Sequence, residues 1–255
     1  MLPGGSVLRY KASGVAAGMD LGTDSALFDS DAHHLAVMSA ATRPAVHSGR
    51  AIDSAGAQAL KRAVDLLAAV ALLIFGTPLC VLVGLAIRLE DGGPILFRQT
   101  RVGRGGALFT LYKLRSMRSD AEADSGPQWA APDDARVTRI GRWIRALRID
   151  EIPQAWNVLV GDMSFVGPRP ERPEFVCLLR EAIPAYDHRH RVRPGMTGWV
   201  QLNQPSSHTI DDARRKLEYD LHYLASWSLL LDLYILARTA TIILFDWGHR
   251  ASAPQ

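Results

Sequence analysis

The strongest constraint on the fold of this chain is an apolar run from Leu66 to Ile87 that only Thr77 interrupts. A helix of about 22 residues, rising about 1.5 Å per residue, is long enough for a hydrocarbon layer of roughly 30 Å. Pro78 lies in the middle of the run, where it removes a backbone N–H donor and crowds the preceding turn. We therefore expect the helix to bend or break at Thr77 and Pro78, giving two halves of about eleven residues each.

The charges at the two ends of this run indicate how it meets a membrane. Basic residues flank both ends: Lys61 and Arg62 before it, and Arg88, Arg98, Arg101 and Arg104 after it. Because basic flanks favour the cytoplasmic side, we expect both ends on that side and a re-entrant membrane helix over residues 59–90. A single straight crossing and a buried core helix are the alternatives, and the length of the run weighs against the core helix.

Composition limits how much of the chain meets lipid. The 255 residues have a mean hydropathy of +0.02, which is high for a soluble protein and low for one with several membrane spans. A formal net charge of +3 favours contact with something anionic, such as phosphate, a membrane surface or nucleic acid. Two cysteines, Cys80 and Cys177, are too few for a disulfide framework and favour a reducing, cytoplasm-facing context.

The remaining segments predict a mostly helical α+β fold. Residues 1–58 have no sustained hydrophobic period and predict a disordered, variable tail, in which His33 and His34 are more readily solvated than metal-bound. Residues 91–225, with short strands near their start and helices later, predict a small cytoplasmic domain. Residues 249–255 form a second tail.

The late apolar stretch over residues 226–248 predicts an amphipathic helix. Asp232 and Arg238 interrupt it, and Trp227 and Trp247 bracket it. Internal charges with aromatic residues at both ends are typical of a helix that lies in the membrane interface and closes the domain. Packing against the domain core is the alternative.

An arginine recurs every third residue from Arg136 to Arg148, and two carboxylates follow at once. Asp150 and Glu151 precede a proline and a helix-like apolar segment, so we expect Asp150 at the N-cap and Glu151 at the first helical position. Simple capping is one interpretation. The other is a positive pocket in which Arg145 and Arg148 bind phosphate and keep Asp150 ionised as a nucleophile or metal ligand. Adjacent carboxylates also suit Mg²⁺.

Other polar residues are candidates for the same pocket. Pro168 and Pro170 would hold Arg169 stiffly in a loop that can bind a base or a phosphate, with a surface turn as the alternative. A basic run that ends at Arg193 suits a phosphate-rich ligand, although a solvated surface is its default interpretation. The remaining candidates are Lys113, Arg115 and Asp220.

Common catalytic motifs are missing from the sequence. It contains no GK[ST] phosphate loop, no GxGxxG between a strand and a helix, and no GxSxG, HExxH or protein-kinase motif set. Their absence excludes the commonest nucleotide-binding folds, hydrolases and kinases.

Five ordered blocks resemble the bacterial sugar transferases, the monotopic phosphoglycosyl transferases that begin glycan assembly on a polyprenyl phosphate. The blocks lie between Lys61 and Phe245 and read KRAVDLLAAV, GPILFRQTRVGRGGALFTLYKLRSM, LRIDEIPQAWNVLVGDMSFVGPRPERPEF, RHRVRPGMTGWVQLN and KLEYDLHYL. The resemblance implies a catalytic domain on the cytoplasmic face of the bacterial inner membrane, behind a re-entrant helix broken at Pro78. Thr77 stands where a serine often precedes that proline, which is a small departure because threonine can make the same backbone bond.

The resemblance also implies a reaction, the first membrane step of exopolysaccharide, O-antigen, capsule or other glycan assembly. Asp150 would attack the β-phosphate of a UDP-sugar and expel UMP, and polyprenyl (undecaprenyl) phosphate would then take the sugar phosphate. Glu151 and Mg²⁺ would assist at Asp150. Lys113 and Asp220 match further functional residues of the family, and the loop around Arg169 matches a segment near the nucleotide.

Several properties stay open at this point. Membrane lipids are expected partners and nucleic acid is not, while a homodimer, the sugar and the polyprenol length are undetermined. Two other functions fit the same residues: a non-catalytic basic module for anionic lipid or nucleic acid, and a membrane-anchored glycosyltransferase or phosphohydrolase that uses the same acidic pair.

Overall fold

The computed structural model describes residues 54–123, 126–129, 134–203 and 209–245. The two predicted tails, including His33 and His34, lie outside these residues, except that residues 55–58 belong to the first helix. The fold is mostly helical α+β, as predicted. The larger helices are α3 (Ala55–Asp91), α6 (Pro173–Ala182), α8 (Ile210–Ser226) and α9 (Leu229–Phe245), and the shorter ones are α4 (Arg139–Ala146), α5 (Gln154–Val160) and α7 (Trp199–Asn203).

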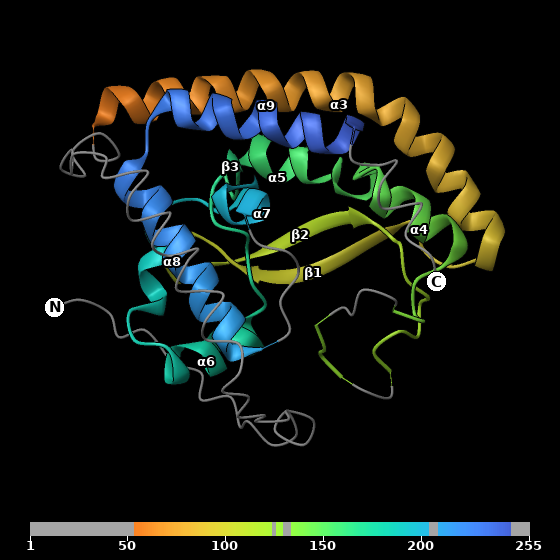
Figure 1. Ribbon diagram of the computed structural model, residues 1–255. Coiled ribbons are helices and arrows are strands. Elements are labelled where there is room, and N and C mark those ends of the chain that lie inside the picture. The colour runs from red at the N-terminus through yellow and green to blue at the C-terminus, as the bar shows by residue number, and fades with distance from the viewer. Residues whose placement is uncertain (1–53, 124–125, 130–133, 204–208, 246–255) are drawn as a thin grey trace, which may run out of the picture. The chain divides into compact units, whose positions relative to one another are not determined.

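The apolar run lies in one continuous helix of 37 residues, so the expected separation into two half-helices is wrong. Pro78 lies inside α3, and Thr77 Oγ1 donates a hydrogen bond of 2.5 Å to the Leu73 carbonyl one turn earlier. In Figure 1 the helix runs along the top of the molecule and turns downward toward its C-terminal end. α3 is long and apolar enough to cross a membrane, and most of its apolar stretch is exposed. The re-entrant hairpin stays a prediction.

The basic residues before the apolar run are engaged with the protein. Lys61 Nζ lies 2.6 Å from Asp232 Oδ2 of α9, and Arg62 donates to the carbonyls of Val158 and Leu159 at the end of α5. Asp232 is 3% exposed and also accepts from the Tyr223 hydroxyl. The charge inside the late apolar stretch is therefore a core contact of α9 with α3 and α8. The other face of α9 exposes Leu230 and Leu233, and these two side chains are what supports the predicted interfacial position of the helix.

Two small sheets support the helices. β1 (Leu96–Val102) and β2 (Leu108–Leu114) form an antiparallel hairpin in the segment where short strands are predicted. Its turn is the 3₁₀ segment η3 (Arg104–Gly106), where the glycine at position 105 adopts φ 66°, a left-handed conformation that glycine takes without a Cβ clash. β3 (Ser164–Val166) pairs in parallel with β4 (Gly195–Thr197).

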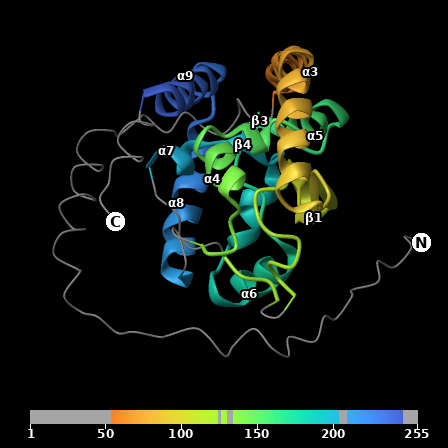
Figure 2. The same ribbon diagram turned by 90° about the vertical axis from the view of Figure 1, so that its right-hand side faces the viewer.

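α5 lies between α3 and the β1–β2 hairpin (Figure 1), and Figure 2 shows it beside α3 from a second direction. Ala69 of α3 and Ala155 and Val158 of α5 are fully buried and share a core cluster with Leu111 of β2. Asn157 satisfies two backbone groups at the edge of β2. Its carboxamide donates a hydrogen bond to the Thr110 carbonyl and accepts one from the Tyr112 amide. This packing fixes the start of α5 beneath the apolar helix.

Candidate active site

The Asp-Glu pair lies in a short 3₁₀ segment, η4 (Ile149–Glu151), between α4 and α5. Arg148 precedes it with φ 56°, and this left-handed residue reverses the chain after α4. α5 starts only at Gln154, with Pro153 as its N-cap and no side-chain capping bond. The expected N-cap role of Asp150 is therefore wrong, because a second turn intervenes before the helix.

The arginine stripe does not form one face. Only Arg139–Ala146 is helical, with Thr138 Oγ1 accepting from the Gly141 amide as the N-cap. Arg136 pairs with Asp134 instead, at 2.6 Å. Arg145 and Arg148 are the two arginines of the stripe that turn toward the acidic pair, as the sequence predicts.

Glu151 is buried, and one of its carboxylate oxygens contacts three cationic side chains. Its Oε1 lies 2.7 Å from Arg169 Nη2, 3.3 Å from Lys113 Nζ and 3.3 Å from Arg148 Nη1. Burial alone would raise the pKa of Glu151, but the charges of these cations, Arg169 first, hold that pKa well below its usual range. Glu151 is thus an ionised carboxylate that gathers basic side chains from β2, η4 and the loop after β3.

Asp150 has a different environment although it is the next residue. It is 6% exposed, and its Oδ1 has no hydrogen-bond partner within the described part of the chain. Burial raises the pKa of Asp150, with the charge of Lys113 opposing and the charge of Glu151 adding to the rise. The sequence hypothesis of a positive pocket would suggest that the nearby arginines lower the pKa of Asp150. In the structure the effect of burial outweighs theirs, and the pKa of Asp150 is raised.

Arg145 and Lys113 both carry positive charge close to Asp150. Arg145 Nε donates to Ser116 Oγ at 2.8 Å, and burial lowers the pKa of Arg145 while the charge of Asp150 opposes the change. Burial likewise lowers the pKa of Lys113, against the charge of Glu151. The site therefore holds an unpaired carboxylate among partly desolvated cations, an arrangement that suits a phosphate ester with several negative oxygens.

The loop Gly167–Pro170 is held by its backbone, so that the side chain of Arg169 can reach Glu151. Two arginines each bind one loop carbonyl: Arg189 Nη2 donates to Arg169 O at 2.9 Å, and Arg101 Nη1 donates to Pro170 O at 3.0 Å. A small pocket beside the loop is lined by Val102, Gly103, Pro168, Arg169, Pro170, Arg189, His190, Val192 and Pro194.

Asp220 lies behind this loop. Its Oδ2 is 2.8 Å from Arg189 Nη2, and Arg189 Nη1 donates to the Tyr186 hydroxyl at 2.6 Å. Burial raises the pKa of Asp220 and the charge of Arg189 opposes the rise. Asp220 therefore reaches the acidic pair only through Arg189 and the loop. Sequence reasoning missed Arg189 because it stands in a basic run whose default interpretation is a solvated surface; its burial depends on residues from η5 (Tyr186–Arg191) and α8.

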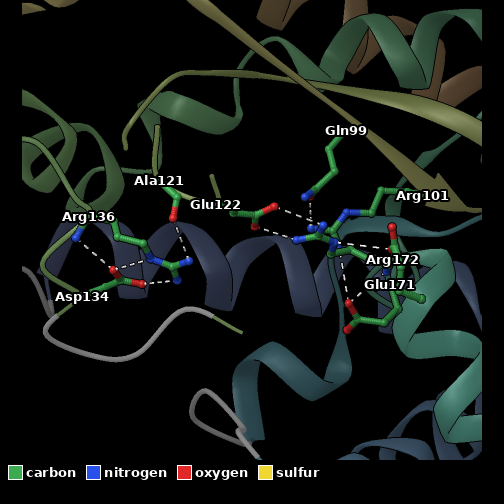
Figure 3. A network of polar contacts seen from close by, with 9 residues as sticks. Gln99, Arg101, Ala121, Glu122, Asp134, Arg136, Glu171 and Arg172 are labelled. Carbon is green, nitrogen blue, oxygen red and sulfur yellow. Dashed lines mark hydrogen bonds and ion pairs between the residues drawn. The ribbon is translucent and has the colours of Figure 1, made fainter. Parts of the chain in front are cut away.

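A second network holds Ala121 and Glu122, which follow β2 (Figure 3). Arg172, next to the loop, pairs with Glu122 at 2.7 Å, and Arg101 pairs with Glu171 at 3.2 Å. Arg136 contacts the Ala121 carbonyl from the other end of the segment. Through Arg172, these contacts hold Glu122 next to the residues that follow the Gly167–Pro170 loop, where Arg101 also binds.

Two predicted binding residues lie elsewhere. Arg115 forms a bidentate pair with Asp91 at the end of α3, and its guanidinium fills the space beside Gly93. Arg193 donates through Nε to the Gly161 carbonyl, and its charged neighbours are Arg62, Arg104 and Asp65. Both arginines hold other parts of the fold together, and the structure does not bring them to Asp150. Thr77 and Pro78 follow Gly76, against which Ile152 packs beside the acidic pair.

The donor set fits the implied Mg²⁺. The three contacts of Glu151 all fall on Oε1, so Oε2 is not engaged by them, and Asp150 Oδ1 is likewise unpartnered. Mg²⁺ commonly takes one or two carboxylates and completes its shell with water and substrate phosphate. Over the described ranges no three His, Cys, Asp or Glu side chains form a metal-binding group, so any such ion would depend on this pair and on substrate.

The site thus combines a buried carboxylate with lysine and arginine side chains, and a long apolar helix packs beside it. The chain belongs to the bacterial sugar transferase family, whose profile matches residues 56–246.

Three relatives show what the chain is similar to. The chain is 46% identical over 191 residues to UDP-N-acetylgalactosamine-undecaprenyl-phosphate N-acetylgalactosaminephosphotransferase of Aeromonas hydrophila, covering 75% of this chain and 45% of the relative. It is 47% identical over 184 residues to undecaprenyl-phosphate glucose phosphotransferase of Komagataeibacter xylinus, covering 70% and 35%. With UDP-glucose:undecaprenyl-phosphate glucose-1-phosphate transferase of Caulobacter vibrioides it shares 44% identity, covering 72% and 69%. The chain thus spans less than half the length of the first two relatives.

Proposed function

We propose that this protein transfers a sugar 1-phosphate from a UDP-sugar to polyprenyl (undecaprenyl) phosphate through a covalent intermediate on Asp150. The observation that carries the proposal is the contrast within the acidic pair: Glu151 contacts three cations, whereas Asp150 Oδ1 is buried without a hydrogen-bond partner among the described residues. The names of the relatives support the same donor and acceptor classes, and they include both glucose and N-acetylgalactosamine donors.

In the first step a carboxylate oxygen of Asp150 attacks the β-phosphorus, the bond from that phosphorus to the bridging oxygen breaks, and UMP leaves with the electron pair. In the second step an oxygen of polyprenyl phosphate attacks the same phosphorus and the carboxylate leaves, which gives polyprenyl-diphosphate sugar. Lys113, Arg145 and Arg169 offset the charge of the phosphates. Mg²⁺ bound to Asp150 and Glu151 would neutralise further pyrophosphate charge.

The proposal places the site at the cytoplasmic face of the inner membrane, with α3 re-entrant and α9 in the interface. The apolar side chains that α3 leaves in solvent include Leu67 at 74% exposure and Phe75 at 80% exposure, and burying them in lipid is strongly favourable. α5 adds exposed Trp156 and Val160 close to Asp150 in sequence. One substrate is soluble and the other lies in lipid, so this position lets both reach one carboxylate.

The test is a product assay. Protein extracted in detergent is incubated with Mg²⁺ and a panel of UDP-sugars, with and without polyprenyl phosphate, and UMP, UDP and phosphate are quantified separately. We expect UMP with one donor, and a phosphosugar adduct on wild type that Asp150→Asn lacks. UDP as product would indicate a glycosyltransferase and free phosphate a phosphohydrolase. A folded Asp150→Asn protein that keeps more than about a tenth of the wild-type rate would contradict the role of Asp150.

A further inference from the structure

A second polar group near Asp150 is buried without a partner. Gln154, the first residue of α5, is 1% exposed, and its Nε2 has no hydrogen-bond partner in the part of the chain that the structure describes. A buried amide donor is costly to leave unsatisfied, and such groups in native proteins are filled by protein, water or ligand. The position of Gln154 indicates which of these fills it.

The turns before α5 place the side chain of Gln154 on the same side of the chain as Glu151 and Asn157, whose contacts the structure gives. Ile152 N donates to Ile149 O and Ala155 N donates to Ile152 O, so this segment repeats every three residues and side chains three apart lie above one another. Glu151 and Asn157 therefore flank Gln154. Glu151 contacts Lys113 of β2, and Asn157 contacts Thr110 and Tyr112 of β2. By this spacing the side chain of Gln154 is expected on the β2 side of the segment, between those of Glu151 and Asn157.

Among the described residues, two buried atoms of complementary kind lack a hydrogen-bond partner within one span of five residues: the acceptor Asp150 Oδ1 and the donor Gln154 Nε2. They do not bond to each other. A group that accepts from the amide while it reacts with the carboxylate would satisfy both, and a phosphoryl group does so through a non-bridging oxygen and its phosphorus. The amide is neutral, so it stabilises negative charge without competing for Glu151, which already binds Lys113, Arg148 and Arg169.

We propose that Gln154 is a further catalytic residue, whose Nε2 donates to a non-bridging oxygen of the transferred phosphate as that phosphate bonds to Asp150. This inference rests on the proposed function. Negative charge grows on this oxygen when the carboxylate attacks, so the hydrogen bond is stronger in the transition state than in the bound substrate. The donor should therefore act mainly on kcat.

The experiment compares full-length Gln154→Met with wild type in the donor half-reaction, with the rate of UMP release and of adduct formation on Asp150 measured after rapid acid quench. Methionine keeps the length of the side chain and removes the donor. We expect the rate to fall about 10²-fold, the usual effect of removing one such donor, with little change in KM for the UDP-sugar. Unfolding temperature should not fall, because an unsatisfied buried group is removed. Gln201→Met on α7, which also lacks carboxamide partners, is the matched control.

Gln154→Glu supplies an independent readout. A glutamate here donates only when protonated, so the rate relative to wild type should recover as the pH is lowered; a purely structural role gives no such recovery. A wild-type rate of Gln154→Met, a wild-type rate of Gln154→Glu at neutral pH, or equal losses in Gln154→Met and Gln201→Met would overturn the inference. Failure of the wild-type protein to release UMP from any donor would instead reject the proposed function itself.

Discussion

Ile152 packs so closely on Gly76 that a β-carbon at position 76 would lie 2.7 Å from Ile152 Cγ2. Gly76 directly precedes Thr77 and Pro78 in α3, and Ile152 directly follows Glu151. The residue before Thr77 and Pro78 is thus in direct contact with the residue that follows the acidic pair. Under the proposed function, this contact would connect the membrane helix to the carboxylate that reacts.

Gly76→Ala should therefore impair both fold and activity. The added methyl group forces Ile152 to move, and overpacking of this kind typically costs about 1–3 kcal/mol. Because Ile152 carries Glu151 with it, we expect UMP release to fall by about tenfold or more. Gly56→Ala is the control, since nothing lies within 4 Å of a β-carbon there. Thermal unfolding and UMP release are measured for both, and equal effects would show that the contact is unimportant.

Asp150→Asn should abolish transfer and stabilise the fold. The pKa of Asp150 is raised in the folded protein, so the native state binds its proton more tightly than the unfolded chain does. Wild-type stability is therefore lost as the pH rises through the unfolded pKa toward the folded pKa, and the asparagine variant lacks this loss. Unfolding temperatures in EDTA, measured from pH 4 upward (about the usual pKa of an aspartate), should show a growing advantage for Asp150→Asn that levels off above the folded pKa. An advantage that shrinks with pH would contradict the burial of this charge.

Asp220 should behave as a positioning residue. It contacts Arg189, which holds the backbone of Arg169, so its loss should loosen the loop. We expect Asp220→Asn to lower kcat/KM about tenfold, as partners one step behind a site typically do. Asp220→Glu should recover part of the activity because it restores the charge. Glu218→Gln on the exposed side of α8 is the control. Direct participation of Asp220 in chemistry would instead give a loss as complete as that of Asp150→Asn.

Local patterns in the sequence predicted short strands before helices in residues 91–225, and the approach of Arg145 and Arg148 to the acidic pair. Predictions from local patterns failed where the conformation of another residue or a contact distant in the sequence determines the role of a side chain. The capping role predicted for Asp150 failed because Arg148 adopts a left-handed conformation that starts a separate turn. Arg115 resembled a ligand because its partner, Asp91, is 24 residues away in sequence. Such pairings leave no local signal.

The arginine stripe offers a direct comparison of two neighbouring turns of α4. Arg145 donates to Ser116 and lies close enough to Asp150 for each charge to affect the other's pKa, whereas Arg142 is exposed. Arg145→Ala should lower kcat at least about tenfold, because a partly desolvated cation that meets the transferred phosphate is lost. Arg142→Ala keeps the same helix and loses the same formal charge, so we expect near wild-type UMP release. If both variants lose activity equally, and the loss disappears at high salt, the stripe acts through its summed charge and not through one phosphate contact.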